Sequence, residues 1–134
     1  MKNILLVLFL TIPLFSFISN DSNPKDGQFR QDYNNVAIYD FEKEKWGDWL
    51  RAEHTFVLNY NSRNDVLHVK ANGENLIYKK IGDLKEGYNT NGDRYQSFQA
   101  LDEDGIRFSF LLYDDSEIGV MMIYSNIKIQ FAYF

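Results

Sequence analysis

Apolar and polar residues alternate from residue 36 onward, with a turn signal about every ten residues. Alternation places every second side chain on the same face of a strand, so the pattern predicts β-strands rather than helices. A charged stretch, 42–51, follows the first expected strand and is interpreted as a helical turn. The predicted strands are 36–41, 54–61, 65–71, 75–81, 94–101, 106–113, 120–124 and 127–134.

Turn residues set the expected pairing of the early strands. The dipeptide Asn72-Gly73 predicts a two-residue hairpin turn, because that turn needs positive φ at both central positions. Counting outward from it pairs Val69 with Leu76. Across the four-residue loop 61–64, the same count places Val69 opposite Phe56, so both hairpins present these residues on one buried face.

The later turns predict the same kind of pairing. The loop 103–105 ends in a glycine suited to the left-handed conformation, and it pairs Phe98 with Phe110. A two-residue turn at 125–126 brings the last two strands together with their apolar residues on one face. Successive hairpins that share one apolar face form an antiparallel meander.

The predicted fold class is all-β, an antiparallel meander of about eight strands that closes into a small barrel. Closure is favoured because an open sheet would leave aggregation-prone edges, and no segment is predicted to cover them. A two-sheet β-sandwich is the alternative. The segment 82–92 is too long for a tight hairpin and is expected to form a loop that could fold over a barrel mouth.

The N-terminus predicts export. Lys2 precedes an apolar run, 4–18, whose roughly 15 residues would span only about 22 Å as a helix, short of a ~30 Å hydrocarbon core. A charged start, a short apolar stretch and a polar follow-on are typical of a secretory signal peptide. The expected organisation is a signal peptide (1–19), a disordered tether (20–35) and a single β-barrel domain (36–134). The mature protein is expected in the periplasm or outside the cell, not spanning the membrane.

Charge and cysteine content narrow the function classes. Removing Lys2 with the leader leaves 13 basic residues against 19 acidic ones, a net charge of −6. Nucleic-acid binding depends on Lys and Arg neutralising phosphates, so no nucleic-acid partner is expected. The chain has no cysteine, and stability must therefore come from packing, to which its aromatic residues contribute most.

Residues suited to catalysis or metal binding are few. In the predicted register His54 points inward and His68 outward, whereas a zinc site needs three or four converging ligands. The acidic stretches 102–104 and 114–117 coincide with turns, where Asp is favoured for backbone reasons. Calcium binding by these turns, or by 89–93, is the alternative. We expect no catalytic residues, no metal, no cofactor and no enzyme activity.

The chain resembles two groups of proteins. Gly47-Asp48-Trp49 is similar to the Gly-x-Trp element at the first strand of lipocalins. In that family the Trp plugs one end of an eight-stranded barrel, and the barrel binds small apolar molecules. The chain also resembles short exported bacterial all-β proteins of uncharacterised role, which carry Trp-x-x-Trp near the start and Asp-x-Asp-Gly before a late strand. A purely structural role for Trp46 or Trp49, as a cap on the core, is the other interpretation.

Two function classes follow. The first is an exported, non-enzymatic, lipocalin-like binding module for a small apolar ligand. The expected ligand-binding residues are Trp49, Phe56, Tyr78, Phe98, Phe108 and Phe110. The alternative is a solid barrel whose surface binds an envelope protein, as an interaction, inhibitor or immunity-type protein. The outward polar residues that would then make contact are His68, Lys70, Lys79, Arg107, Lys128 and Gln130.

Overall fold

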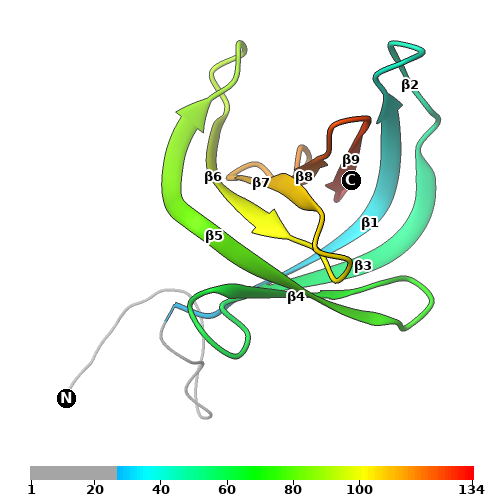
Figure 1. Ribbon diagram of the computed structural model, residues 1–134. Helices are drawn as coiled ribbons and strands as arrows, with labels where there is room; N and C mark the ends of the chain where they lie inside the picture. Colours follow the sequence, from blue (N-terminus) through cyan, green and yellow to red (C-terminus); the bar gives the residue numbers. More distant parts are fainter. Residues whose placement is uncertain (1–26) are drawn as a thin grey trace.

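The computed structural model describes residues 27–134, and every regular element in that range is a β-strand. The strands are β1 (Phe29–Asp40), β2 (Lys45–Trp46), β3 (Leu50–Leu58), β4 (Asp65–Val69), β5 (Asn75–Tyr88), β6 (Arg94–Leu101), β7 (Arg107–Tyr113), β8 (Val120–Ile123) and β9 (Ile127–Ala132). From β3 to β9 each strand pairs antiparallel with the next, and β1 pairs with both β3 and β9. The chain therefore forms a closed eight-stranded barrel with β2 as an extra strand (Figure 1), which confirms the predicted barrel.

β1 closes the barrel because its two parts pair with different neighbours. Its first part, from Phe29 to Val36, pairs with β3, and its second part, from Asn35 to Asp40, pairs with β9. The register with β3 shifts between Tyr33 and Asn35, and such an irregularity bends a strand. Figure 1 shows β1 curving from the lower part of the barrel up to its right-hand side.

The predicted tether over 20–35 is wrong for its last part. Residues 29–35 belong to β1, so the barrel begins well before residue 36. The polar composition of this segment did not predict a strand, although its Tyr33 faces inward and is 2% exposed. The predicted signal peptide (1–19) and the start of the tether lie outside the described residues.

Two further segments differ from prediction. The stretch 42–51 holds no helical turn; β2 lies within it, and β3 begins at Leu50. The carboxylate of Asp40 accepts the backbone N–H groups of Glu42 and Lys43 and so fixes a non-helical turn. The expected long loop 82–92 is mostly strand, because β5 continues past a register shift between Ile81 and Lys85 and pairs with β6 again from Lys85 to Tyr88.

β4 is shifted by one residue relative to the predicted register. Val69 pairs with Asn75 rather than with Leu76. Lys70 donates to the carbonyl of Glu74, so the loop between them is 71–73, one residue longer than the predicted loop 72–73. A one-residue slip exchanges the two faces of a strand. Val66 and His68 therefore point into the barrel, where they are 1% and 4% exposed.

The two later hairpins have the predicted register. Phe98 pairs with Phe110 across the loop 103–105, and Gly105 has a φ of +79°. Across the turn at 125–126, Met122 pairs with Ile129, as the count from that turn predicts. In a compact turn the loop length fixes which residues of the two strands pair, so the register can be predicted from the sequence.

Aromatic rings fill the middle of the barrel. Phe110 is fully buried, and its ring centroid lies 5.0 Å from that of Phe98 and 5.7 Å from that of Phe56. Tyr78 and Phe108 make an edge-to-face contact at 5.2 Å. These five residues were predicted to line a ligand site, but most of them pack against one another as core.

Phe110→Ala is expected to lower the free energy of unfolding by about 3–5 kcal/mol, because the truncation leaves a cavity among rings that cannot collapse onto it. Urea denaturation followed by tryptophan fluorescence measures the change. Ile106→Ala serves as the control, because Ile106 is 53% exposed and its truncation should cost far less. Equal effects of the two substitutions would contradict the packing described here.

Gly119→Ala is expected to destabilise the protein more than Gly105→Ala, although both glycines have a φ of +79°. A Cβ at Gly105 meets open space, so only the left-handed backbone penalty of about 1–2 kcal/mol applies. A Cβ at Gly119 would overlap the backbone carbonyl of Phe131, which should add about 1–3 kcal/mol. Thermal unfolding of the two variants measures the difference, and equal melting temperatures would exclude the close approach.

Candidate functional site

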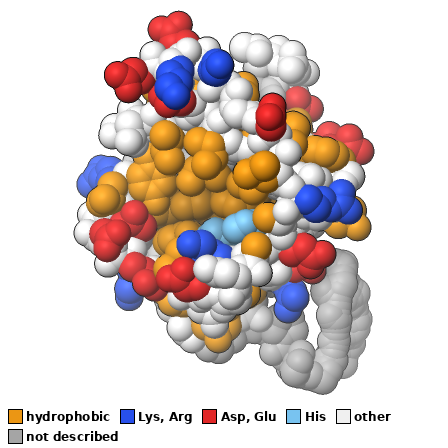
Figure 2. Space-filling model, turned by 90° about the vertical axis from the view of Figure 1, so that its right-hand side faces the viewer, with side chains coloured by type: hydrophobic (Ala, Val, Ile, Leu, Met, Phe, Trp, Pro, Cys, Tyr) orange, Lys and Arg blue, Asp and Glu red, His pale blue; other side chains and the backbone are white. Residues whose placement is uncertain are grey.

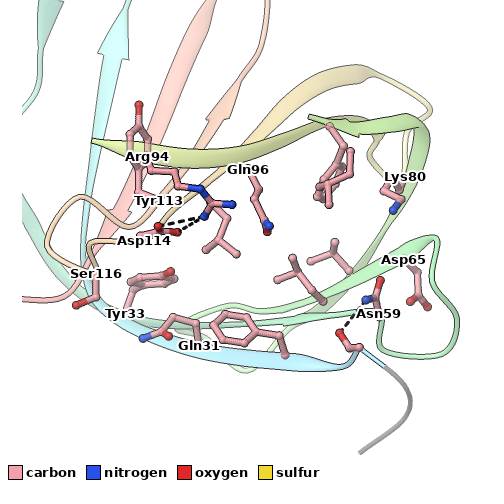
Figure 3. Close-up of a pocket in the computed structure, with 17 residues that line it drawn as sticks. Gln31, Tyr33, Asn59, Asp65, Lys80, Arg94, Gln96, Tyr113, Asp114 and Ser116 are labelled. Atoms are coloured by element: carbon pink, nitrogen blue, oxygen red, sulfur yellow. Dashed lines mark hydrogen bonds and ion pairs between the residues drawn. The ribbon is translucent and has the colours of Figure 1, made fainter. Parts of the chain in front are cut away.

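One end of the barrel contains a pocket of about 480 Å³, shown in Figure 3. Its wall is built by the start of β1, the end of β3, the start of β4 and parts of β5, β6 and β7. The volume lies within the range of about 300–1,000 Å³ that is typical of small-molecule sites. Its apolar lining comprises Phe29, Leu58, Val66, Leu84, Phe98 and Leu112.

An ion-pair network occupies one end of this pocket (Figure 3). Nη1 of Arg94 donates to both carboxylate oxygens of Asp114, at 3.0 and 3.1 Å. Nη2 of the same guanidinium donates to Glu86 at 2.6 Å. Hydrogen bonds to these two carboxylates raise the pKa of Arg94. The network ties the β5–β6 hairpin to the turn after β7 and leaves the guanidinium with two counter-ions.

Polar groups near the opposite end hold the loop between β3 and β4. The carboxylate of Asp65 is 5% exposed and accepts the backbone N–H groups of Asn61 at 3.0 Å and Ser62 at 3.2 Å. The side-chain amide of Asn59 donates to the carbonyl of Gly27 at 2.8 Å. These hydrogen bonds satisfy the polar groups within the protein, so they fix the shape of the wall.

The side chains of Tyr33, Gln96 and Lys80 in the pocket lack such partners among the described residues. The hydroxyl of Tyr33 makes no hydrogen bond within residues 27–134, although the residue is only 2% exposed. Figure 3 shows this hydroxyl directed into the pocket, and the side chain of Gln96 extending into it from β6. Neither the amide of Gln96 nor the ammonium of Lys80 is paired with a described polar side chain. Burial raises the pKa of Tyr33 above its usual range, so its hydroxyl remains a neutral donor.

A chain of hydrogen bonds runs through the core beside the pocket. Nδ1 of His68 lies 2.6 Å from the hydroxyl of Tyr78, and its Nε2 lies 2.8 Å from Nδ1 of His54. The His68 ring stacks on Phe56 at 4.2 Å between centroids. The prediction that the two histidines face opposite sides is wrong, because the shifted register of β4 turns His68 inward.

One neutral proton arrangement accounts for both contacts of this chain. Tyr78 donates to Nδ1 of His68, Nε2–H of His68 donates to Nδ1 of His54, and both imidazoles are neutral. Burial first, and then the charges of His54 and Lys70, lower the pKa of His68 to about 3. Burial and the charge of Lys70 also lower the pKa of His54. The chain is therefore a satisfied neutral network within the core.

The structure separates the six predicted ligand-binding residues. Phe98 lines the pocket, whereas Phe56, Tyr78, Phe108 and Phe110 belong to the packed core. Trp49 is 43% exposed and its ring contacts Phe134 at 5.1 Å, so the expected plugging of the barrel by this Trp is wrong.

Sequence reasoning missed the polar residues of the pocket. Tyr33 falls within the predicted tether, and Lys80 and Gln96 fall within predicted strands, with no ligand-binding role expected for them. The sequence does indicate that two of them face inward. Lys80 lies two residues after Tyr78 and Gln96 two residues before Phe98, so each lies on the same face of its strand as a predicted core residue. Polar residues on the inward face of a strand indicate a part of the barrel interior that is open to solvent or to a ligand.

Trp46 does not cap the core. Its ring contacts Tyr39 at 5.3 Å on the outer surface, where both rings lie under the ammonium of Lys128, at 5.4 and 5.0 Å. This cation–π cluster holds β2 against β1 and β9. Lys128, which was predicted to contact a partner protein, thus makes cation–π contacts within this chain.

Acid is expected to destabilise the protein through His68. Its folded-state pKa lies below the usual value of about 6.5, so the unfolded state takes up the proton first. The contribution of His68 to the free energy of unfolding is complete above about pH 6.5 and declines as the pH falls toward 3. Between pH 7 and pH 5 the free energy of unfolding should decrease by about 2 kcal/mol. Urea denaturation at both pH values measures it. The variant His68→Gln should lose less stability over the same interval, and an equal loss would exclude His68 as the source.

Within residues 27–134 there is no cluster of three or more His, Asp or Glu side chains suited to a metal ion. The same part of the chain contains no helix with the length and hydropathy for crossing a membrane. Comparisons with protein-family models, with curated proteins and with solved structures found no match to this chain.

Proposed function

We propose that the protein binds a small, largely apolar molecule in the pocket at the end of the barrel. The observation that carries this proposal is the hydroxyl of Tyr33, which is buried, directed into an apolar-walled pocket and without a partner among the described residues. A ligand acceptor would receive a hydrogen bond from this hydroxyl, with a net contribution of about 0.5–1.5 kcal/mol. The apolar part of the ligand would contact Leu58 and Phe98.

The pocket replaces the barrel lumen as the proposed site. The aromatic core closes the middle of the barrel, so a ligand would rest on Phe98 and Val66 rather than pass between the core rings. Apolar side chains supply most of the wall surface and polar side chains lie among them, a combination that occurs in small-molecule sites. Binding without covalent chemistry suits these side chains, since burial keeps the Tyr33 hydroxyl protonated.

Export is part of the proposal. It rests on the apolar run 4–18 after Lys2 and on the polar residues that follow it. A binding protein in the periplasm or outside the cell would meet its ligand there.

Contact with another protein is the second candidate function. Figure 2 shows a broad, hollowed apolar area on the face that corresponds to the right-hand side of Figure 1. Large apolar side chains near the end of β1 and the start of β3 are exposed: Leu50 by 62%, Ile38 by 46% and Trp49 by 43%. Exposed apolar areas of this kind occur at protein interfaces.

Native mass spectrometry of the protein purified from its own host should show an added small-molecule mass. Gln96→Trp should remove that mass, because the bulkier indole would project into the pocket and obstruct ligand binding. Gln99→Trp is the matched control, since Gln99 lies on the same strand and is exposed on the outer face. An added mass that survives Gln96→Trp would place the ligand elsewhere. Co-purification of a protein without any small-molecule mass would favour the second candidate.

A further inference from the structure

We infer that the pocket ligand carries a negative charge, bound by Lys80, and is therefore an amphipathic anion such as a medium-chain carboxylate. This inference rests on the proposed function and adds the chemical class of the ligand. It depends on the position of Lys80, on the pairing of the other charges and on the donors that remain free.

Lys80 places its ammonium inside the pocket. Its side chain lines the pocket, and Nζ lies 5.6 Å from the centroid of the Phe98 ring. Figure 3 shows Lys80 at the end of the pocket opposite the pair formed by Arg94 and Asp114. The neighbouring Lys79 is exposed, as the alternation of strand β5 requires.

The other charged side chains of the pocket already have hydrogen-bond partners within the protein. Arg94 has two carboxylate partners, Glu86 and Asp114. The carboxylate of Asp65 accepts backbone N–H groups of the loop that follows β3. Lys80 makes no ion pair with any described carboxylate. Of the two described cations in the pocket, Arg94 and Lys80, only Lys80 has no carboxylate partner.

The unpartnered groups define what the ligand must offer. An ammonium has only donors, the hydroxyl of Tyr33 can donate, and the amide of Gln96 supplies two more donors besides its acceptor oxygen. A ligand that complements Lys80 must therefore bring acceptors, and a charged acceptor makes the stronger hydrogen bond. The apolar wall accepts the rest of the molecule. Both requirements are met by an anionic head joined to an apolar body.

The net negative charge of the protein does not decide the sign of the ligand. Exposed charges are screened over a Debye length of about 8 Å at physiological salt. The unpaired ammonium lies within the pocket and acts on a bound head group directly. A direct contact with the ammonium therefore acts on the head group at shorter range than the exposed charges that make up the overall value of −5.

Calorimetric titration of the full chain at pH 8 with decanoate, decan-1-ol and decylamine tests the inference. These probes share a ten-carbon chain and differ in head-group charge. Decanoate should bind at least about tenfold more tightly than either of the other two. Acetate, which has the head group without the chain, should give no measurable binding.

Lys80→Gln should weaken decanoate binding by about tenfold or more and leave decan-1-ol binding nearly unchanged. Lys79→Gln removes the same charge from the outer face of the same strand, so its affinity for decanoate should stay within about twofold of the unmodified protein. Thermal unfolding of both variants establishes that they are folded.

The outcomes separate the two proposals. If the neutral or cationic probe binds as tightly as decanoate, or if the two lysine variants behave alike, the anionic assignment is overturned while the pocket stands as a binding site. If none of the ten-carbon probes binds the unmodified protein, the proposed function fails together with this inference.

Discussion

The double pairing of β1 is the constraint on which the structure depends. One strand supplies hydrogen-bond partners to β3 and to β9, so the meander closes and its eight strands have no free edge. The bend between the two parts of β1 also organises the C-terminus, because Asn34 and Asn35 both donate to the carbonyl of Phe134. Tyr33, just before the bend, points inward and becomes part of the pocket. The short segment 33–35 therefore takes part in barrel closure, contacts Phe134 and contributes to the candidate site.

Closure also limits where a ligand can bind. A small barrel filled by large aromatic rings has little free volume in its middle. The stacked rings of Phe98 and Phe110, 5.0 Å apart, mark the change from core to pocket, since Phe98 lines the pocket and Phe110 is fully buried. The space that remains lies at the end of the barrel, where Tyr33 of β1, Lys80 of β5 and Gln96 of β6 line the pocket.

The barrel contains two kinds of buried polar group, and they differ in what they imply. Tyr78, His68 and His54 satisfy one another in a neutral chain, as buried groups in a stable core usually do. Tyr33 is equally buried but makes no hydrogen bond with the described residues. The satisfied chain contributes to the stability and pH dependence of the fold. The unsatisfied hydroxyl, with Lys80 beside the same apolar wall, is better explained by a ligand.

The amino-acid sequence by itself determined the all-β class, the meander and the register of the hairpins at 103–105 and 125–126, because alternation and compact turns act between neighbours in the chain. It could not determine the face of β4, since a longer turn at 70–74 shifts the register and turns His68 inward. Nor could it show that the polar segment 29–35 is a strand, because the partners of that strand, β3 and β9, are distant in the chain. The candidate site combines Tyr33, Lys80 and Gln96 from separate strands, and only closure of the barrel brings these side chains to one pocket.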